Sequence, residues 1–270
     1  MLNDITIGQF FPGNSVIHRM DSRFKIVLDI IYVVMLFTAQ NFYGLGIACV
    51  FMIMVYSVSG ISFRLIFKSI KPVLAIIIFT ALLNLLFVRG DDTPLIDTGF
   101  ITIYWKGVET SIFMVVRILF LIIGMSLLTY TTSPIVLTDA IESLLSPLKK
   151  VKFPVHELAM MMTIALRFIP TLIEELNKIM MAQKARGAAL DTGNVFSRAK
   201  AMVPILIPLF VSAFKRANEL ATAMECRCYK GGEGRTKLRV LRFSKLDIYA
   251  SGLTLCVFGM VIINNIVFAK

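Results

Sequence analysis

Two arginines close the two long helical segments that we expect in the C-terminal half of the chain. The sequence reads Ala-Gln-Lys-Ala-Arg-Gly at 182–187 and Ala-Met-Glu-Cys-Arg-Cys at 223–228, so Arg186 and Arg227 each follow an alanine by four positions. One arginine in a last helical turn complements the helix dipole and needs no partner. Two in the same setting indicate an interaction role, because a planar guanidinium pairs with carboxylates through two hydrogen bonds and stays charged when partly buried. We therefore predict that these two helix ends bind carboxylates of a protein partner.

Metal and nucleotide chemistry find little support in the sequence. His156-Glu157 begins like the helix of a zinc metalloprotease, but Met160 stands where that motif has its second histidine. We expect Glu157 to support the first turn of its helix through the helix dipole instead. The glycine-rich run at 231–237 lacks the Lys-Ser/Thr pair with which a phosphate-binding loop neutralises a nucleotide. The sequence thus predicts no metal, no cofactor and no hydrolysis of ATP by this chain.

Methionines gather in the same half of the chain, and two interpretations of them are open. Met160, Met161 and Met162 are consecutive, and four further methionines lie between 180 and 224. They either fill gaps in a core or form an adaptable surface for exchangeable partners, because the thioether side chain repacks readily. The second interpretation makes the three consecutive methionines candidate contacts for another subunit.

The elements that hold these residues are those of a membrane protein. Of the 270 residues, 57% are hydrophobic and only 17% are charged, which is too apolar for an ordinary soluble domain. Several apolar runs approach the roughly 20 residues that cross a bilayer as a helix, and none alternates as in a β-barrel. We expect an all-α polytopic membrane protein with about five transmembrane helices and a cytoplasmic or interfacial domain of long amphipathic coupling helices.

The formal net charge of +11 is distributed unevenly along the chain. In the predicted topology 24 of the 28 Lys and Arg residues lie on one side, six of them up to Lys71 and 18 between Lys149 and Lys245. Such segregation is the positive-inside pattern of a membrane protein. It predicts a cytoplasmic N-terminus, a C-terminus outside, contact with anionic lipid headgroups, and no nucleic-acid partner.

The positions of the apolar runs divide the chain into three segments. A membrane domain at 1–132 holds four spans, a coupling domain at 133–247 holds three amphipathic helices, and a last span lies within 248–270. Ser133 and Pro134 open the coupling domain as the N-cap and the first helical residue. We expect the spans at 26–39, 45–58, 72–88, 108–130 and 248–268, and the coupling helices at 133–148, 154–186 and 195–226.

Two other classes of function remain open on the residues alone. An ion-coupled secondary carrier needs an ionisable group deep in a span, and the candidates are Asp29 and Glu109 near span ends and Arg117 inside the fourth span. We expect Arg117 to snorkel or to pair with a polar neighbour. An intramembrane enzyme needs a nucleophile with a base, or a metal set, within the spans, whereas both histidines lie outside them. A carrier, or another polytopic membrane protein with a cytoplasmic interaction domain, is therefore the alternative to a non-catalytic subunit.

Short motifs in a fixed order extend over nearly the whole chain. They read His-Arg-x-Asp-x-Arg-x-Lys at 18–25, Thr-Ser-Pro-Ile-Val-Leu-Thr-Asp at 132–139, Leu-Arg-Phe-Ile-Pro at 166–170, Ala-Gln-Lys-Ala-Arg-Gly at 182–187 and Gly-Gly-Glu-Gly-Arg-Thr at 231–236. In this order and spacing they resemble the transmembrane (T) component of energy-coupling factor (ECF) transporters, a CbiQ-like family. Those transporters are the ATP-driven vitamin and micronutrient importers of prokaryotes.

The resemblance implies roles for the residues at the two helix ends. In that family, Ala-Arg-Gly type motifs end coupling helices that dock in grooves of two ABC-type ATPase subunits, so Arg186 and Arg227 would carry the docking. The second motif departs from the family pattern, because cysteines flank its arginine in place of small residues. The flanking positions are Ala185, Gly187, Cys226 and Cys228.

The resemblance also implies what the chain does within a complex. It would be a non-catalytic scaffold that joins the ATPase pair to a small membrane protein, the substrate-binding (S) subunit, and transmits the motion of the ATPases to it. Met160, Met161 and Met162 would then be contacts for the substrate-binding subunit.

Overall fold

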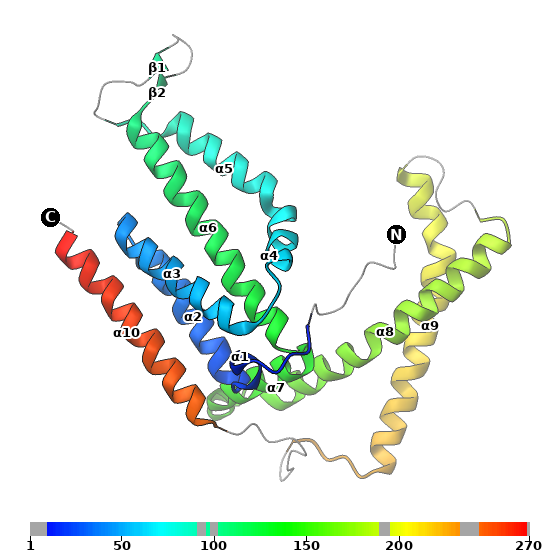
Figure 1. Ribbon diagram of the computed structural model, residues 1–270. Coiled ribbons are helices and arrows are strands. Elements are labelled where there is room, and N and C mark those ends of the chain that lie inside the picture. The colour runs from blue at the N-terminus through cyan, green and yellow to red at the C-terminus, as the bar shows by residue number, and fades with distance from the viewer. Residues whose placement is uncertain (1–9, 91–95, 98–101, 189–194, 233–242, 269–270) are drawn as a thin grey trace. The chain divides into compact units, whose positions relative to one another are not determined.

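A computed structural model of the chain describes residues 10–90, 96–97, 102–188, 195–232 and 243–268 (Figure 1). The chain divides into two compact units, which are described separately. Unit 1 comprises Met1–Ala140 and Val240–Lys270, and unit 2 comprises Ile141–Arg239. The C-terminal helix thus returns to the unit in which the chain begins.

Unit 1 is a bundle of long apolar helices. After the short helix α1 (Val16–Arg19) come α2 (Ser22–Thr38), α3 (Phe42–Ser59), α5 (Leu74–Phe87), α6 (Trp105–Thr131) and α10 (Lys245–Phe268). Each of the five expected spans lies within one of these long helices or within one or two residues of it, so the all-α polytopic fold is confirmed. Strands β1 (Ile96–Asp97) and β2 (Thr102–Ile103) pair antiparallel between α5 and α6.

The segment between the second and third expected spans, where no helix was predicted, is helical in the structure. Helix α4 (Phe63–Ile70) and a 3-10 turn η1 (Lys71–Val73) lead directly into α5. The helix is stabilised by tertiary packing, because Leu65 and Ile66 pack against the core of the bundle while Arg64 and Lys68 stay exposed. The apolar and basic residues of α4 stand on different faces, as in an amphipathic helix.

The core of unit 1 is formed chiefly by α2, α3 and α6. Tyr32, Met35 and Leu36 of α2 are almost fully buried against α3, and α6 closes the core from the other side. Gly124 permits the close approach of α6, because a Cβ at this position would lie 2.7 Å from Cε1 of Tyr32. Small residues of this kind let membrane helices pack backbone against side chain.

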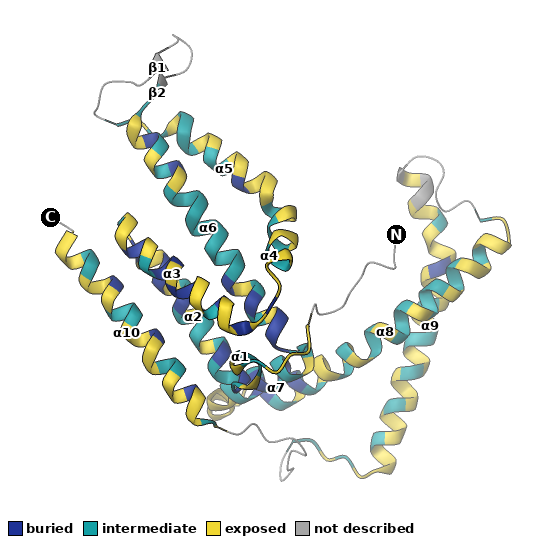
Figure 2. Ribbon diagram, in the orientation of Figure 1, coloured by how far each residue is buried: buried dark blue, intermediate teal, exposed yellow. Residues whose placement is uncertain are grey.

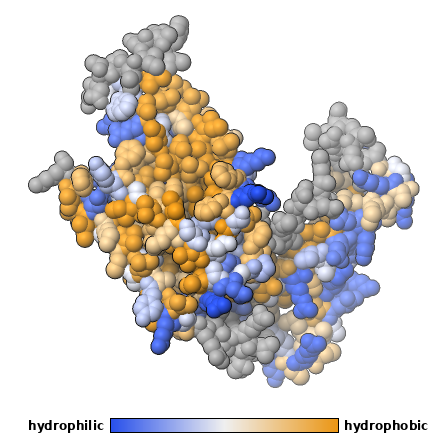
Figure 3. Space-filling model, viewed as in Figure 1, coloured by the Kyte–Doolittle hydropathy of each residue, from blue (hydrophilic) through white to orange (hydrophobic). Residues whose placement is uncertain are grey.

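The outer surfaces of the bundle are apolar. Figure 2 shows buried residues confined to the inner sides of the helices, and Figure 3 shows hydrophobic side chains covering the visible face of α5 and α6. Exposed Ile76, Ile78 and Phe79 of α5 belong to this surface. A protein surface of this extent and composition is suited to lipid rather than to water.

Unit 2 contains the two longest helices that the structure describes. Helix α7 (Pro134–Leu144) crosses the boundary between the units, and a 3-10 segment η2 (Ser146–Val151) leads to α8 (Val155–Ala185) and then α9 (Val195–Cys226). The first coupling helix therefore ends earlier than the predicted 133–148, because Pro147 stands in the first turn of the 3-10 segment. The other two agree with the prediction within one residue at each end.

Length and composition alone do not separate α8 and α9 from the spans. Among the described residues, six helices are long and apolar enough to cross a membrane, and both α8 and α9 are among them. Helix α2, with 17 residues, lies at the short end of the range for a span. That α8 and α9 lie at the cytoplasmic interface, within a coupling domain at 133–247, remains a prediction.

Candidate functional site

The end of α8 is built as a helix cap with Arg186 at its centre. Arg186 is the C-cap residue, and the amide of Gly187 donates to the carbonyl of Lys184 while the amide of Ala188 donates to that of Gln183, both at 3.0 Å. Gly187 has φ of +83°. These two bonds and the left-handed residue define the Schellman motif, in which glycine is favoured because it has no Cβ.

The end of α9 repeats this motif atom for atom. The amide of Cys228 donates to the carbonyl of Glu225 at 2.8 Å, and the amide of Tyr229 donates to that of Met224 at 3.0 Å. Arg227 therefore occupies the position of Arg186, and Cys228, with φ of +56°, occupies that of Gly187. The similarity of the two sequences thus reflects an equivalent backbone at the two helix ends.

Both arginine side chains are available to a partner. Arg186 and Arg227 are exposed, as are the flanking residues Ala185, Gly187, Cys226 and Cys228. Within the part of the chain that the structure describes, neither guanidinium has a hydrogen-bond or ion-pair partner. The structure thus presents two equivalent, positively charged helix ends.

A polar contact fixes where α8 and α9 cross. Ser212 Oγ donates to one carboxylate oxygen of Glu175, and Arg216 Nη2 donates to the other at 2.9 Å. Arg186 lies eleven residues after Glu175, and Arg227 lies eleven residues after Arg216. At 1.5 Å per residue, each arginine stands about 16 Å beyond the crossing.

Each helix continues beyond the crossing as an arm, which runs from Glu175 to Arg186 in α8 and from Arg216 to Arg227 in α9. The two arms diverge. In Figure 1 the C-terminal end of α8 and the C-terminal end of α9 point in different directions, so the two arginines do not form one cluster. The two exposed arginines therefore belong to two separate helix ends and not to one pocket.

The three candidate methionines lie near the N-terminal end of α8. Met161 is 60% exposed and Met162 is 37% exposed, whereas Met160 is half-buried. Met161 therefore does not fill a gap in the core of unit 2, which was the first of the two interpretations of the methionines. Helix α9 adds an exposed apolar face of its own that the residue-by-residue analysis of the sequence did not single out; it comprises Val203, Leu206, Ile207, Phe210, Val211 and Phe214.

His156 has a structural environment. Its Nδ1 lies 3.1 Å from Oε1 of Glu142, and Gly232 passes so close that a Cβ there would lie 2.5 Å from Cδ2 of the imidazole. The histidine thus joins α7 to α8 and supports the backbone that follows α9. This contact between distant residues explains a histidine that the motif analysis left without a role.

Arg117 also has structural partners. Its Nη2 donates to the carbonyl of Ala39, the C-cap residue of α2, and its guanidinium lies over the rings of Phe113 at 4.6 Å and Phe37 at 5.9 Å. A cation at a helix C-terminus is stabilised by the helix dipole. Of the two expectations for this residue, snorkelling and pairing with a polar neighbour, the structure shows the second, and such a pairing needs no transported ion.

Substitutions at the left-handed residues of the two caps should change helix stability in opposite directions. Cys228→Gly should stabilise the end of α9 by about 1 kcal/mol, because a left-handed conformation costs a residue with a Cβ that much; Gly187→Ala should destabilise the end of α8 by a similar amount. Hydrogen exchange of the capping amides of Tyr229 and Ala188 would measure both changes. Faster exchange in Cys228→Gly would contradict the assigned motif.

Comparison with known proteins places the chain in a family. Residues 13–238 match the model of the family described as "Cobalt transport protein" (CbiQ). Proteins named "Energy-coupling factor transporter transmembrane protein EcfT" are 50% identical in Clostridium kluyveri over the whole of both chains, and 49% identical in Ruminiclostridium cellulolyticum over 99% of this chain and 100% of the relative. The protein of that name from Bacillus subtilis is 48% identical over 92% of this chain and 93% of its own length.

These similarities extend over the membrane helices and over both arginine motifs. They do not favour the alternative function, a secondary carrier. The chain belongs to the CbiQ family and is the transmembrane energy-coupling component of an ECF transporter.

Proposed function

We propose that this chain is a non-catalytic scaffold on which two ABC-type ATPase subunits dock at Arg186 and Arg227. The observation that carries the proposal is the repeated Schellman cap, which presents an exposed arginine at each of two equivalent helix ends. A guanidinium held in this way is suited to bidentate pairing with a carboxylate. Two equivalent ends on diverging arms fit two similar subunits.

The second partner is a substrate-binding membrane subunit, which contacts the apolar surface of α8 and α9. Met161 and Met162 on α8 and the exposed apolar face of α9 are unpaired surfaces within unit 2. Apolar surface of this size marks a protein or membrane contact, and methionines adapt to partners of different shape. The nutrient carried would be bound by that subunit rather than by this chain.

The crossing of α8 and α9 transmits movement between these partners. When the ATPases change their separation, the arms that carry the two arginines move with them. The contact of Glu175 with Ser212 and Arg216 holds the helices together at the crossing, so the movement reaches the apolar surface instead of being lost in independent motions of the two helices.

The proposed orientation places the N-terminus in the cytoplasm and the C-terminus outside. Helices α2 and α10 begin at the same end of unit 1, because Asp21 at the start of α2 is bonded to Asp247 at the start of α10. The basic residues up to Lys71, and Lys245 at the start of α10, favour the cytoplasm for this end. Helix α10, with 24 residues, is long enough to carry the chain across.

Copurification tests the proposal. The tagged wild-type chain, produced with the ATPase and substrate-binding subunits of a transporter, should retain two ATPase subunits and one substrate-binding subunit per copy, as measured by native mass spectrometry. Uptake into liposomes should then require ATP. A chain that binds no ATPase, and drives uptake alone in response to an ion gradient, would contradict the scaffold and favour a carrier.

A further inference from the structure

The N-terminal segment at 18–25 contacts the exit junction, which is the connection between α6 and α7 and lies in unit 1 before the chain enters unit 2 at Ile141. Helix α6 ends at Thr131 and α7 begins at Pro134, so only two residues connect them. The ammonium of Lys25 donates to the carbonyl of Thr131 at 3.1 Å, to Oγ1 of Thr132 at 3.3 Å and to the carbonyl of His18 at 3.4 Å. All three of its hydrogens therefore have acceptors, and two of these lie in the exit junction.

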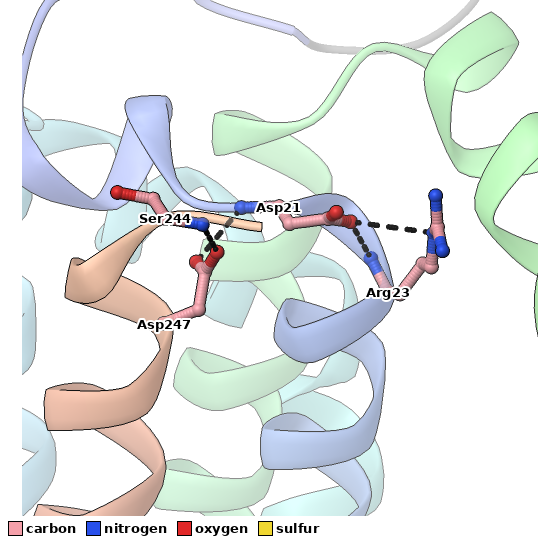
Figure 4. A network of polar contacts seen from close by, with 4 residues as sticks. All are labelled: Asp21, Arg23, Ser244 and Asp247. Carbon is pink, nitrogen blue, oxygen red and sulfur yellow. Dashed lines mark hydrogen bonds and ion pairs between the residues drawn. The ribbon is translucent and has the colours of Figure 1, made fainter. Parts of the chain in front are cut away.

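The same segment contacts the return junction, which is the start of α10, shortly after the chain has returned to unit 1. One oxygen of the Asp247 carboxylate, near the start of α10, accepts from the amide of Asp21 at 3.0 Å, and the other accepts from the amide of Ser244 at 2.8 Å (Figure 4). The Ser244 hydroxyl in turn accepts from the amide of Leu246 at 3.3 Å, close to the geometry of a capping box. Asp247 thus caps its own helix and binds the start of α2 as well.

Charge and aromatic contacts surround this return junction. Asp21 accepts from the amide of Arg23, and the guanidinium of Arg23 lies 3.7 Å from the same carboxylate and 5.3 Å from the ring of Phe243. Figure 4 shows the four polar residues of this network in one chain of contacts, in the order Ser244, Asp247, Asp21 and Arg23. The junction is thereby tied to α2 by hydrogen bonds and by a cation–π contact.

These anchoring residues are buried, which makes their contacts sensitive to change. Asp247 is 0% exposed, Asp21 is 6% exposed and Lys25 is 7% exposed. Burial lowers the pKa of Lys25, and the negative charges of Asp247 and Asp21 partly offset this effect. When one partner is removed from a buried network, the other is left without a hydrogen bond or a compensating charge. The loss of folding free energy is then much larger than for the removal of an exposed contact.

We propose that Lys25 and Asp247 are positioning residues that fix the exit junction and the return junction to one point of unit 1, the start of α2. A displacement of the helices between the junctions is then passed to α6 and α10 together and reaches the membrane helices as one movement. Without this double anchor, each junction would yield separately and the movement would be absorbed locally. The inference rests on the proposed function, because it assumes that the ATPases move the helices of unit 2.

The test measures coupling separately from assembly. Asp247→Asn keeps the shape of the side chain but replaces one acceptor oxygen by a donor that faces an amide N–H. In the complete complex in proteoliposomes, this variant should bind both ATPases as the wild type does and hydrolyse ATP at a similar rate. Substrate taken up per ATP hydrolysed should fall at least tenfold. Lys245→Met is the matched control, because Lys245 lies on the same helix two residues earlier and is exposed.

A milder variant covers the case in which Asp247→Asn does not fold. Thr132→Val removes one acceptor of Lys25 and preserves the side-chain volume, so uptake per ATP should fall two- to fivefold with unchanged thermal unfolding of the complex. Normal uptake per ATP in a folded Asp247→Asn or in Thr132→Val would overturn the double anchor. Loss of ATPase binding in Thr132→Val would overturn it too, because the anchor acts after docking. Absence of ATPase binding by the wild type would instead defeat the proposed function.

Discussion

Replacing both Arg186 and Arg227 by alanine is expected to abolish stable binding of the ATPase subunits. Each arginine stands at a capped helix end and should pair with a partly desolvated carboxylate of a partner. Removal of one member of such a pair costs about 2–5 kcal/mol, much of it because the other charge is left buried and unpaired. Each single variant should therefore weaken binding more than about 30-fold, as measured by titration of ATPase subunits onto the chain in nanodiscs.

Two controls separate docking from general loss of charge. Arg167→Ala removes an exposed arginine from the same helix α8, away from its end, and should leave ATPase binding unchanged. Arg186→Lys retains the charge but not the planar fork, so its binding should lie between that of the wild type and that of the alanine variant. ATP-driven uptake at the normal rate by the double alanine variant would contradict the assigned role of both arginines.

The second large effect is expected at the methionines of α8. Met161→Ser with Met162→Ser should weaken binding of the substrate-binding subunit at least tenfold and leave ATPase binding intact. Burial of one methionine side chain contributes about 1.5–3 kcal/mol, so even partial burial of two exceeds the 1.4 kcal/mol that corresponds to a tenfold change. Copurification of the substrate-binding subunit with the variant, at several subunit concentrations, would measure the effect.

A matched control lies on the same helix. Met181 is 64% exposed near the other end of α8, so Met181→Ser removes similar surface far from the proposed contact and should not affect the substrate-binding subunit. Replacement of Met160, Met161 and Met162 by β-branched residues should narrow the range of substrate-binding subunits that the chain accepts. Unchanged binding of every such subunit in both variants would show that these methionines make no contact with the partner.

The helix ends show what a single sequence can and cannot predict. The helix predicted at 154–186 ends directly before Gly187, and glycine is the usual residue in the left-handed position of a cap. Cys228 gave no such signal, since residues with a Cβ rarely adopt that conformation, and the equivalence of the two caps became visible only in the backbone bonds. The preference of glycine for the left-handed position therefore indicates the end of α8, whereas the residue type at 228 gives no indication of the cap at the end of α9.

Contacts between residues distant in sequence were not predictable. Asp21 and Asp247 are 226 positions apart, and their hydrogen bond gives a role to an N-terminal motif that was recognised only by resemblance. No helix was predicted at α4, and the packing of Leu65 and Ile66 that stabilises it depends on the folded bundle. In α8 and α9, length and composition suit both a span and an interfacial helix, so only the distribution of charge favours the interface.

Site-specific photocrosslinking in the assembled transporter tests the central claim most directly. Photoreactive amino acids would replace Ala185 and Cys226, which flank the two arginines and are exposed, and Met161 on the apolar surface. The account predicts that positions 185 and 226 each crosslink to an ATPase subunit, and that position 161 crosslinks to the substrate-binding subunit. Crosslinks from 185 and 226 to the substrate-binding subunit, or from neither position to an ATPase, would contradict it.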